Sequence, residues 1–463
     1  MTLLSGTCFV DCTETVCSDV NAGIPRTVRN IIGRGAMISD VLGMKIIPVV
    51  SINGTFYQYN PGRYRKVCTR LLSAVVGALR NLLDTFYYGK KVNLDSVQIT
   101  PSSNVFRAGA DLRPEAAALD VVSSGNIHLR IIEFCRKIIP FLFRITFYFD
   151  GVLKGFAEAT IGPHDIILYP DVFWYRSTYL TFARYDAVKI LLLHDIIPLI
   201  MPEACHAVYV LSFKRSLAGA LRHIDGILTI SRSELASIQT VLSDNGLDGV
   251  KLLDYNYWGA DFSSEQSVHG SVRPRVVKAL SKLPTFIMVG TLEPRKNHAL
   301  VLDAFDLFWQ RGGNASLCFV GKISPLCMDL KARIERHDLL GNRLFLFQDI
   351  SDAELAYSYE NCAGVVFASR AEGFGLPLVE AMWYGRPILA SDIPVFREIG
   401  GDYPKYFPPD DSERLVELIN ACLQHVNSDK NPRQWLSWDE SVLNLFGKVA
   451  KMSETVMDQR QCR

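Results

Sequence analysis

The sequence predicts an α/β protein with two Rossmann-like domains that face each other across a cleft. Short apolar runs alternate with amphipathic stretches through most of the 463 residues, a pattern typical of parallel strands connected by helices. The alternation restarts near residue 285, after a polar stretch. A chain of this length also has room for two or three domains, each with its own core.

Each element of the first half follows from a short apolar run or from the segment after it. The predicted strands are Cys8–Cys12, Lys45–Ser51, Asp165–Tyr169, Val188–Leu193 and Gly226–Ile230. The stretch 21–25 is Asn-Ala-Gly-Ile-Pro, which predicts a glycine loop ahead of a helix over 26–32. Helix-like segments lie in the other connections, so the order of elements favours a doubly wound sheet.

The second half repeats this order. Its predicted strands are Thr285–Gly290, Ala315–Val320, Arg343–Phe347 and Ala363–Ala368, and its predicted helices include Ala299–Gln310 and Asp329–Arg336. We place the domains at 1–270 and 271–435, with a hinge near 255–280. A terminal helix within 436–463 is expected to pack back onto the first domain.

Bulk properties exclude several classes. The formal charge is +1, which gives no argument for nucleic acid as a partner. No apolar run reaches the roughly 18 residues of a spanning helix, and the N-terminus lacks a signal-peptide pattern. The eleven cysteines form no C-x-x-C pair, which favours reduced thiols and a cytoplasmic protein.

Two segments mix basic and apolar residues. Residues 61–91 carry seven basic side chains against one acid among many leucines and valines, and 130–154 add arginines beside aromatic residues. Such a surface suits peripheral contact with the inner face of the cytoplasmic membrane. A core helix with solvated cationic edges is the alternative, and the sequence leaves both open.

The most informative stretch lies at 371–381. It places Glu372 and Glu380 on either side of a Gly-Phe-Gly turn, directly after the predicted strand at 363–368. Pro377 suits the first position of a helix, and the free N–H groups of a first helical turn form an anion site. A phosphate-bearing ligand is therefore expected at this helix start.

A second loop adds positive charge at the same sheet edge. The sequence Gly-Thr-Leu-Glu-Pro-Arg-Lys-Asn follows the strand at 285–290 and precedes a helix, so Arg295 and Lys296 are expected near the glycine turn. A guanidinium and an ammonium group together suit a diphosphate.

These motifs, with Gly-Arg-Pro at 385–387 and Ser-Asp-Ile-Pro at 391–394, resemble the retaining nucleotide-sugar glycosyltransferases of family 4, which have the GT-B fold. The resemblance implies that Glu380 binds the donor's ribose and that Glu372 faces the donor sugar. It also implies that Arg295 and Lys296 neutralise the leaving diphosphate. The backbone that would lie near sugar and diphosphate is that of Phe374, Gly375 and Leu376.

The first half adds further candidates. His194 and Asp195 follow a predicted strand, and the resemblance places such a histidine beside the donor sugar; a capping turn is the alternative. Gly23 would let a helix N-terminus approach the diphosphate. Asp11 ends the first strand, where it could contact acceptor, as could Asp195, or simply cap the loop.

The resemblance implies transfer of a hexose, mannose or similar, from a GDP- or UDP-sugar to a carbohydrate or lipid-linked glycan. The form of the Arg-Lys motif resembles bacterial mannosyl- or rhamnosyl-type enzymes of lipopolysaccharide, O-antigen or exopolysaccharide synthesis. The chain has no D-x-D motif, so we expect neither a metal nor another cofactor.

Other functions are weighed against this one. A nucleotide-sugar epimerase of similar fold and a catalytically silent scaffold in a polysaccharide assembly complex remain alternatives. A two-carboxylate glycosidase fits less well because Glu380 belongs to the anion-binding helix turn. A dinucleotide oxidoreductase is disfavoured because Gly-Arg-Gly at 33–35 lacks the third glycine of that fingerprint.

Overall fold

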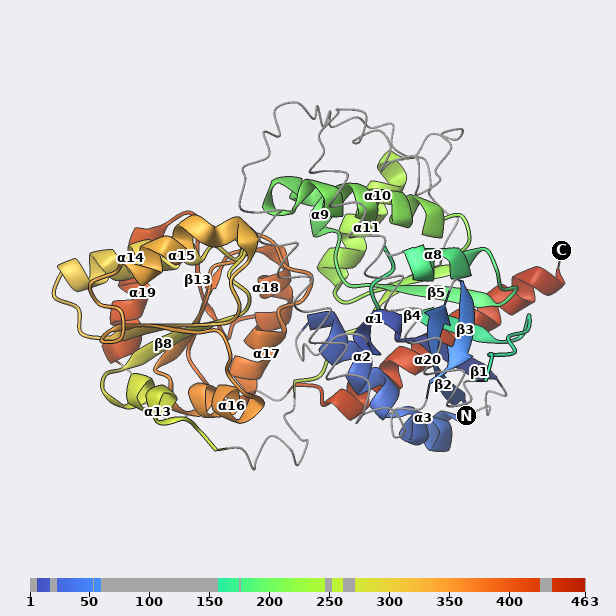
Figure 1. Ribbon diagram of the computed structural model, residues 1–463, viewed down its shortest axis with the longest axis horizontal. Helices are drawn as coiled ribbons and strands as arrows, with labels where there is room; N and C mark the ends of the chain where they lie inside the picture. Colours follow the sequence, from blue (N-terminus) through green and yellow to red (C-terminus); the bar gives the residue numbers. More distant parts are fainter. Residues whose placement is uncertain are drawn as a thin grey trace.

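The protein consists of two α/β lobes, one on each side of a central junction (Figure 1). The structure, a computed structural model, describes residues 6–16, 23–52, 54–59, 157–174, 176–245, 252–260, 271–424 and 435–462. Both basic segments singled out above, 61–91 and 130–154, lie outside these residues, so the choice between membrane contact and core helix stays open. None of the helices that the structure describes is long and apolar enough to cross a bilayer.

The first lobe contains a seven-stranded sheet in the order β3-β2-β1-β4-β5-β6-β7. All neighbours are parallel except β3, which pairs antiparallel with β2 at the edge. The strands are β1 (Thr7–Asp11), β2 (Lys45–Ile52), β3 (Thr55–Gln58), β4 (Ile166–Tyr169), β5 (Val188–Leu193), β6 (Gly226–Thr229) and β7 (Leu252–Tyr255). The described helices are α1 (Thr13–Val16), α2 (Gly23–Gly33), α3 (Gly35–Leu42), α8 (Arg176–Phe182), α9 (Ile197–Ile200), α10 (Ala207–Ala220) and α11 (Arg232–Asp244), with a 3-10 turn at Pro202–Ala204.

The second lobe contains a six-stranded, fully parallel sheet in the order β10-β9-β8-β11-β12-β13. Its strands are β8 (Thr285–Val289), β9 (Ser316–Val320), β10 (Leu344–Phe347), β11 (Gly364–Phe367), β12 (Ile388–Ser391) and β13 (Lys405–Phe407). Its helices are α13 (Pro274–Ser281), α14 (His298–Gln310), α15 (Met328–Glu335), α16 (Asp352–Asn361), α17 (Leu376–Trp383), α18 (Pro394–Gly400) and α19 (Ser412–Gln424), with 3-10 turns η3 (Pro294–Lys296) and η4 (Pro325–Cys327).

Both sheets reverse their strand order once, between β1 and β4 in the first lobe and between β8 and β11 in the second. Open α/β sheets bind ligands outside the carboxyl ends of the strands at such a switch point. The predicted α/β fold with two parallel sheets is therefore confirmed, and its topology indicates where the site lies.

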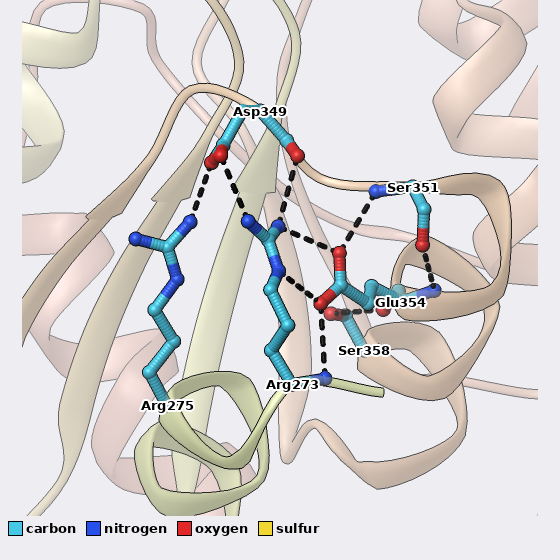
Figure 2. A network of polar contacts seen from close by, with 6 residues as sticks. All are labelled: Arg273, Arg275, Asp349, Ser351, Glu354 and Ser358. Atoms are coloured by element: carbon cyan, nitrogen blue, oxygen red, sulfur yellow. Dashed lines mark hydrogen bonds and ion pairs between the residues drawn. The ribbon is translucent and has the colours of Figure 1, made fainter. Parts of the chain in front are cut away.

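An arginine anchors the chain where the second lobe begins (Figure 2). Arg273 precedes α13, and its guanidinium donates to both carboxylate oxygens of Glu354, at 2.5 and 2.7 Å. Glu354 also caps α16 in a reciprocal capping box with Ser351. The pKa of Glu354 is lowered to about 2, mainly because of the hydrogen bonds from Arg273. These contacts fix the start of the second lobe to α16.

The C-terminal helix α20 (Trp438–Gln461) leaves the second lobe and lies against α2, α3 and β5 of the first (Figure 1). It starts in a capping box, since Ser437 accepts from the backbone of Glu440. Beside this start, the two chain crossings between the lobes contact each other. Trp258 stacks on Trp438 with ring centroids 5.8 Å apart, and Ala260 N–H donates to the Leu436 carbonyl at 3.1 Å.

Candidate active site

The carboxyl ends of β8 and β11 bring three charged side chains together. Glu372 accepts hydrogen bonds at 2.6 Å from both Arg295 Nη1 and Lys296 Nζ. Ser369 Oγ donates to the same carboxylate at 2.8 Å. Burial would raise the pKa of Glu372, but Arg295 and Lys296 outweigh it and lower this pKa to about 2. Glu372 is therefore ionised at any ordinary pH.

Arg295 and Lys296 lie at the sheet edge where the sequence predicted them. The turn that carries them is helical, which was not predicted. The 3-10 turn η3 holds them, and the Arg295 carbonyl accepts from Arg370 N–H at 2.8 Å. Gly290 has φ +140°, and an added Cβ would stand 3.1 Å from Lys296 Cε. This glycine therefore leaves room for the Lys296 side chain to reach Glu372.

The glycine turn leads into α17 one residue earlier than predicted. Gly375 is the N-cap with φ +92°, a backbone conformation that favours glycine. Leu376 is the first helical residue, so Pro377 holds the second position and not the first. The prediction was off by one, but the N–H that proline lacks is still one of the unpaired first-turn donors. Phe374 turns its ring into the core, 6.1 Å from that of Tyr257.

Gly373 lies at a close contact between the two lobes. Its carbonyl accepts from Ser231 Oγ of the first lobe at 2.7 Å. An added Cβ on Gly373 would stand 2.3 Å from the His194 carbonyl oxygen. The turn that carries Glu372 thus lies directly against the carboxyl end of β5.

Glu380 does not stand free at the start of α17. Its Oε1 accepts from Arg26 Nη1 of α2 at 2.6 Å, and its Oε2 accepts from Tyr359 OH at 3.0 Å. Burial alone would lower the pKa of Arg26, but the carboxylate of Glu380 outweighs this and raises it. Gly23, with φ +58°, begins the same helix α2.

His194 and Asp195 lie side by side in sequence but take separate partners. His194 Nε2 donates to the Pro170 carbonyl at 2.7 Å, which leaves Nδ1 as the acceptor of the neutral ring. Burial of the ring lowers the pKa of His194 to about 4, so the ring is uncharged at neutral pH. Asp195 Oδ1 accepts from Ile197 N–H, two residues further along the chain, at 3.2 Å.

Asp11 ends β1 at the switch point of the first sheet, where a second acid stands nearby. Thr13 donates its backbone N–H and its hydroxyl to Asp11 Oδ1, and the Asp11 side chain is fully buried. Burial, with the neighbouring charge of Asp171, raises the pKa of Asp11 to about 7. Asp171 accepts from Thr15 N–H at 2.7 Å.

A pocket opens at this edge of the first sheet. Its walls combine carboxylates with aromatic rings. It is lined by Ile24, Asp171, Phe173, Trp174, Leu192, Leu193, His194, Asp195 and Tyr209. Asp11 is not part of this lining, so of the two predicted acceptor residues only Asp195 reaches the pocket directly.

Three contributors to the site had no signal in the sequence pattern. Arg26 was part of a predicted helix, but nothing marked its pairing with Glu380. Glu398 of α18 accepts from the N–H groups of Arg232 and Ser233 at 2.7 Å each, which caps α11 of the other lobe. Tyr257 OH donates to the same carboxylate at 2.9 Å. Residues in these pairs lie more than a hundred positions apart.

The first comparison with known proteins concerns the second lobe. The family described as glycosyl transferases group 1 matches residues 274–434. The matched residues make up about a third of the chain. The match includes Glu372, Glu380, Arg295 and Lys296, and it confirms the resemblance to glycosyltransferases that the sequence motifs carry. No group of histidine, cysteine, aspartate or glutamate within the described ranges is arranged to hold a metal ion.

Curated relatives extend the likeness. The chain is 32% identical over 260 residues to the serotype-specific mannosyltransferase WbdA of Escherichia coli, a match over 54% of this chain and 32% of that protein. It is 27% identical over 234 residues to the O-antigen chain mannosyltransferase RfbU of Salmonella typhimurium, over 50% of this chain and 60% of that one. The matches thus span less than two thirds of either relative.

Solved structures support the fold of both lobes. A sucrose-phosphate synthase from Thermosynechococcus elongatus superposes with a TM-score of 0.53 at 12% identity, over 99% of both chains. The N-terminal domain of the Candida albicans trehalose-6-phosphate phosphatase superposes with a TM-score of 0.51 at 13% identity, over 99% of this chain and 97% of that one. The group 1 domain therefore stands in the predicted two-domain GT-B arrangement.

Proposed function

We propose that the protein is a glycosyltransferase that moves a hexose, with mannose favoured, from a nucleoside diphosphate sugar to a glycan or lipid-linked glycan acceptor. The observation that carries this proposal is the contact of Arg295 and Lys296 with Glu372 beside the N-terminus of α17. Two fixed cations beside a helix N-terminus suit the negative charge that develops on a leaving diphosphate. The mannosyltransferase relatives support the sugar, and those named for O-antigen synthesis support a surface-polysaccharide pathway.

The donor is proposed to lie between the lobes, with a GDP- or UDP-sugar as the candidate. Its diphosphate would meet the first turn of α17 and the start of α2 at Gly23. His194 Nδ1, an acceptor in the neutral ring, would take a hydrogen bond from a hydroxyl of the sugar. Charge neutralisation by Arg295 and Lys296 supports a reaction without a metal ion.

The acceptor is proposed to enter the pocket of the first lobe, which Asp171 and Asp195 line together with Trp174 and Tyr209. Carboxylates accept hydrogen bonds from sugar hydroxyls, and aromatic rings pack against the apolar faces of sugars. We further propose retention of the anomeric configuration by front-face substitution, in which the leaving phosphate assists deprotonation of the acceptor hydroxyl.

The ionisation of Glu372 argues against glycoside hydrolysis by a carboxylate pair. Such enzymes need one carboxylic acid with a raised pKa as proton donor. The pKa of Glu372 is lowered to about 2, and Glu380 is held by Arg26. Neither acid is therefore placed to protonate a leaving group.

A donor panel tests the proposed function. The protein is incubated with GDP- and UDP-sugars, with and without glycan and lipid-linked acceptors, and the released nucleoside diphosphate is measured. We expect acceptor-dependent release from one donor, and a large loss of this release in Lys296→Met. Lys278→Met is the control and should leave the rate unchanged, because Lys278 is an exposed residue of α13, which leads into the amino end of β8.

The remaining alternatives give different outcomes in the same assay. An epimerase would convert the donor sugar without any acceptor and without net release of nucleoside diphosphate. A silent scaffold would bind no donor at all. Absence of binding and release with every donor in the panel would refute the transferase proposal.

A further inference from the structure

The ion pair between Arg26 and Glu380 joins the two lobes at the proposed donor site. Arg26 belongs to α2 of the first lobe and Glu380 to α17 of the second, and Nη1 and Oε1 are 2.6 Å apart. The side chains are 18% and 3% exposed, respectively. This pair is therefore largely shielded from solvent and is a strong contact across the junction.

If Glu380 binds the donor ribose, as the motif resemblance implies, the ribose and Arg26 compete for the same carboxylate. Arg26 holds one oxygen of Glu380, and the buried Tyr359 hydroxyl holds the other at 3.0 Å. A carboxylate that is only 3% exposed offers no open face to a ribose. If Glu380 binds ribose hydroxyls, Arg26 has to leave it first.

The position of Arg26 indicates where its guanidinium goes. Arg26 lies three residues after Gly23, which begins α2, and Glu380 lies four residues after Leu376, which begins α17. At 1.5 Å per residue, each side chain starts within about 6 Å of its helix N-terminus. A diphosphate at these two helix starts is thus within reach of a long arginine side chain, and its charge suits a guanidinium.

We propose that Arg26 exchanges Glu380 for the diphosphate of the donor and so makes the ribose site available only to ligands that carry phosphate. This proposal rests on the proposed function, because it needs a nucleoside diphosphate as the ligand. In the ligand-free protein Arg26 blocks Glu380. When a nucleoside diphosphate binds, its phosphates draw the guanidinium away and Glu380 receives the ribose. A nucleoside without phosphates cannot trigger the exchange.

Isothermal calorimetry on the full chain tests the exchange with guanosine, GDP, uridine and UDP. In the wild type we expect one of the diphosphates to bind and its nucleoside to bind far more weakly. Arg26→Met removes the block and also the phosphate contact. The nucleoside should then bind more tightly and the diphosphate more weakly, so that the ratio of the two affinities falls by about tenfold or more.

Arg34→Met is the matched control. Arg34 follows the same helix α2 and forms an ion pair with Asp439 of α20 at 2.6 Å, away from Glu380. Both affinities should stay at wild-type values in this variant. If Arg26→Met melts below the assay temperature, Arg26→Gln takes its place with the same expected directions.

The outcomes separate this proposal from the proposed function. Equal weakening of nucleoside and diphosphate in the Arg26 variants, or no change in either, would overturn the exchange while the transferase assignment stands. Failure of the wild type to bind any of the nucleoside diphosphates would overturn both. Opposite shifts of the two ligands support the exchange.

Discussion

The carbonyl oxygen of His194 occupies the space in which residue 373 would carry a side chain, since a Cβ on Gly373 would stand 2.3 Å from it. This oxygen belongs to the backbone and cannot rotate away. Gly373→Ala should therefore push the turn at 372–375 away from β5 and abolish transfer, while each lobe keeps its fold. Circular dichroism and the transfer assay check the two parts. Gly33→Ala, with open space at the added Cβ, should retain activity.

Glu372 should prove as important for stability as for the reaction. It is 9% exposed and pairs with two cations that are themselves largely buried. Removing one partner of a buried ion pair costs about 3–5 kcal/mol because a charge is left uncompensated. We expect Glu372→Ala to lower the unfolding free energy of the second lobe by about this amount in urea titrations. Its loss of activity then has to be measured on the folded fraction.

Glu293 provides the comparison for this prediction. It also pairs with Arg295, at 3.2 Å, but its side chain is 29% exposed. Surface pairs contribute about 0–1 kcal/mol, so Glu293→Ala should change stability little. Similar losses for the two variants would contradict the structural role assigned to Glu372.

Asp11 should make the protein less stable as the pH rises. Its pKa is raised to about 7 in the folded state, against about 3.9 in an unfolded chain. The folded state therefore binds the extra proton between these values, and stability is lost as the pH rises through about 7. Asp11→Asn should reduce the difference in unfolding free energy between pH 5 and pH 8 by on the order of 2 kcal/mol. Chemical denaturation at both pH values measures it.

A surface aspartate is the control for the pH measurement. Asp410 is 77% exposed and pairs with Arg370. Asp410→Asn should leave the difference between pH 5 and pH 8 as it is in the wild type. An Asp11→Asn protein with the wild-type pH dependence would show that Asp11 is not protonated in the folded state.

Glu398 should hold the lobes together through the N-terminus of α11. Its carboxylate accepts from the N–H groups of Arg232 and Ser233, where the helix dipole also favours a negative charge. Glu398→Ala should speed hydrogen exchange at these two amides. Tyr257→Phe removes only one hydroxyl from the same carboxylate and should have a smaller effect. Unchanged exchange in Glu398→Ala would argue against this contact in solution.

Local patterns in the sequence predicted most of the central strands. Val188–Leu193 is a strand with the predicted bounds, because a short run between turns that is apolar except for Lys189 is typical of a buried strand. Boundaries at helix starts were less accurate. Gly375, and not Leu376, caps α17, so Pro377 is the second helical residue and not the first. A difference of one residue changes the pattern of apolar positions too little to be detected.

The partners of the site residues could not be predicted in the same way. Arg26 and Glu380 are 354 positions apart, and their contact depends on how two separately folded lobes meet. Glu398 has a backbone helix start as its partner, which leaves no complementary charge to find in the sequence. The site residues themselves were found because glycine, proline and charge occur there at short spacings.

The contact between the two chain crossings limits how the lobes can move. Trp258 and Ala260 on one crossing are joined to Trp438 and Leu436 on the other. Because the two crossings are joined side by side, they resist sliding past each other but can still bend. Opening of the proposed donor site would thus be a rotation about one axis. Lengthening a single crossing by insertion should leave the separation of the lobes unchanged, since the other crossing would still set it.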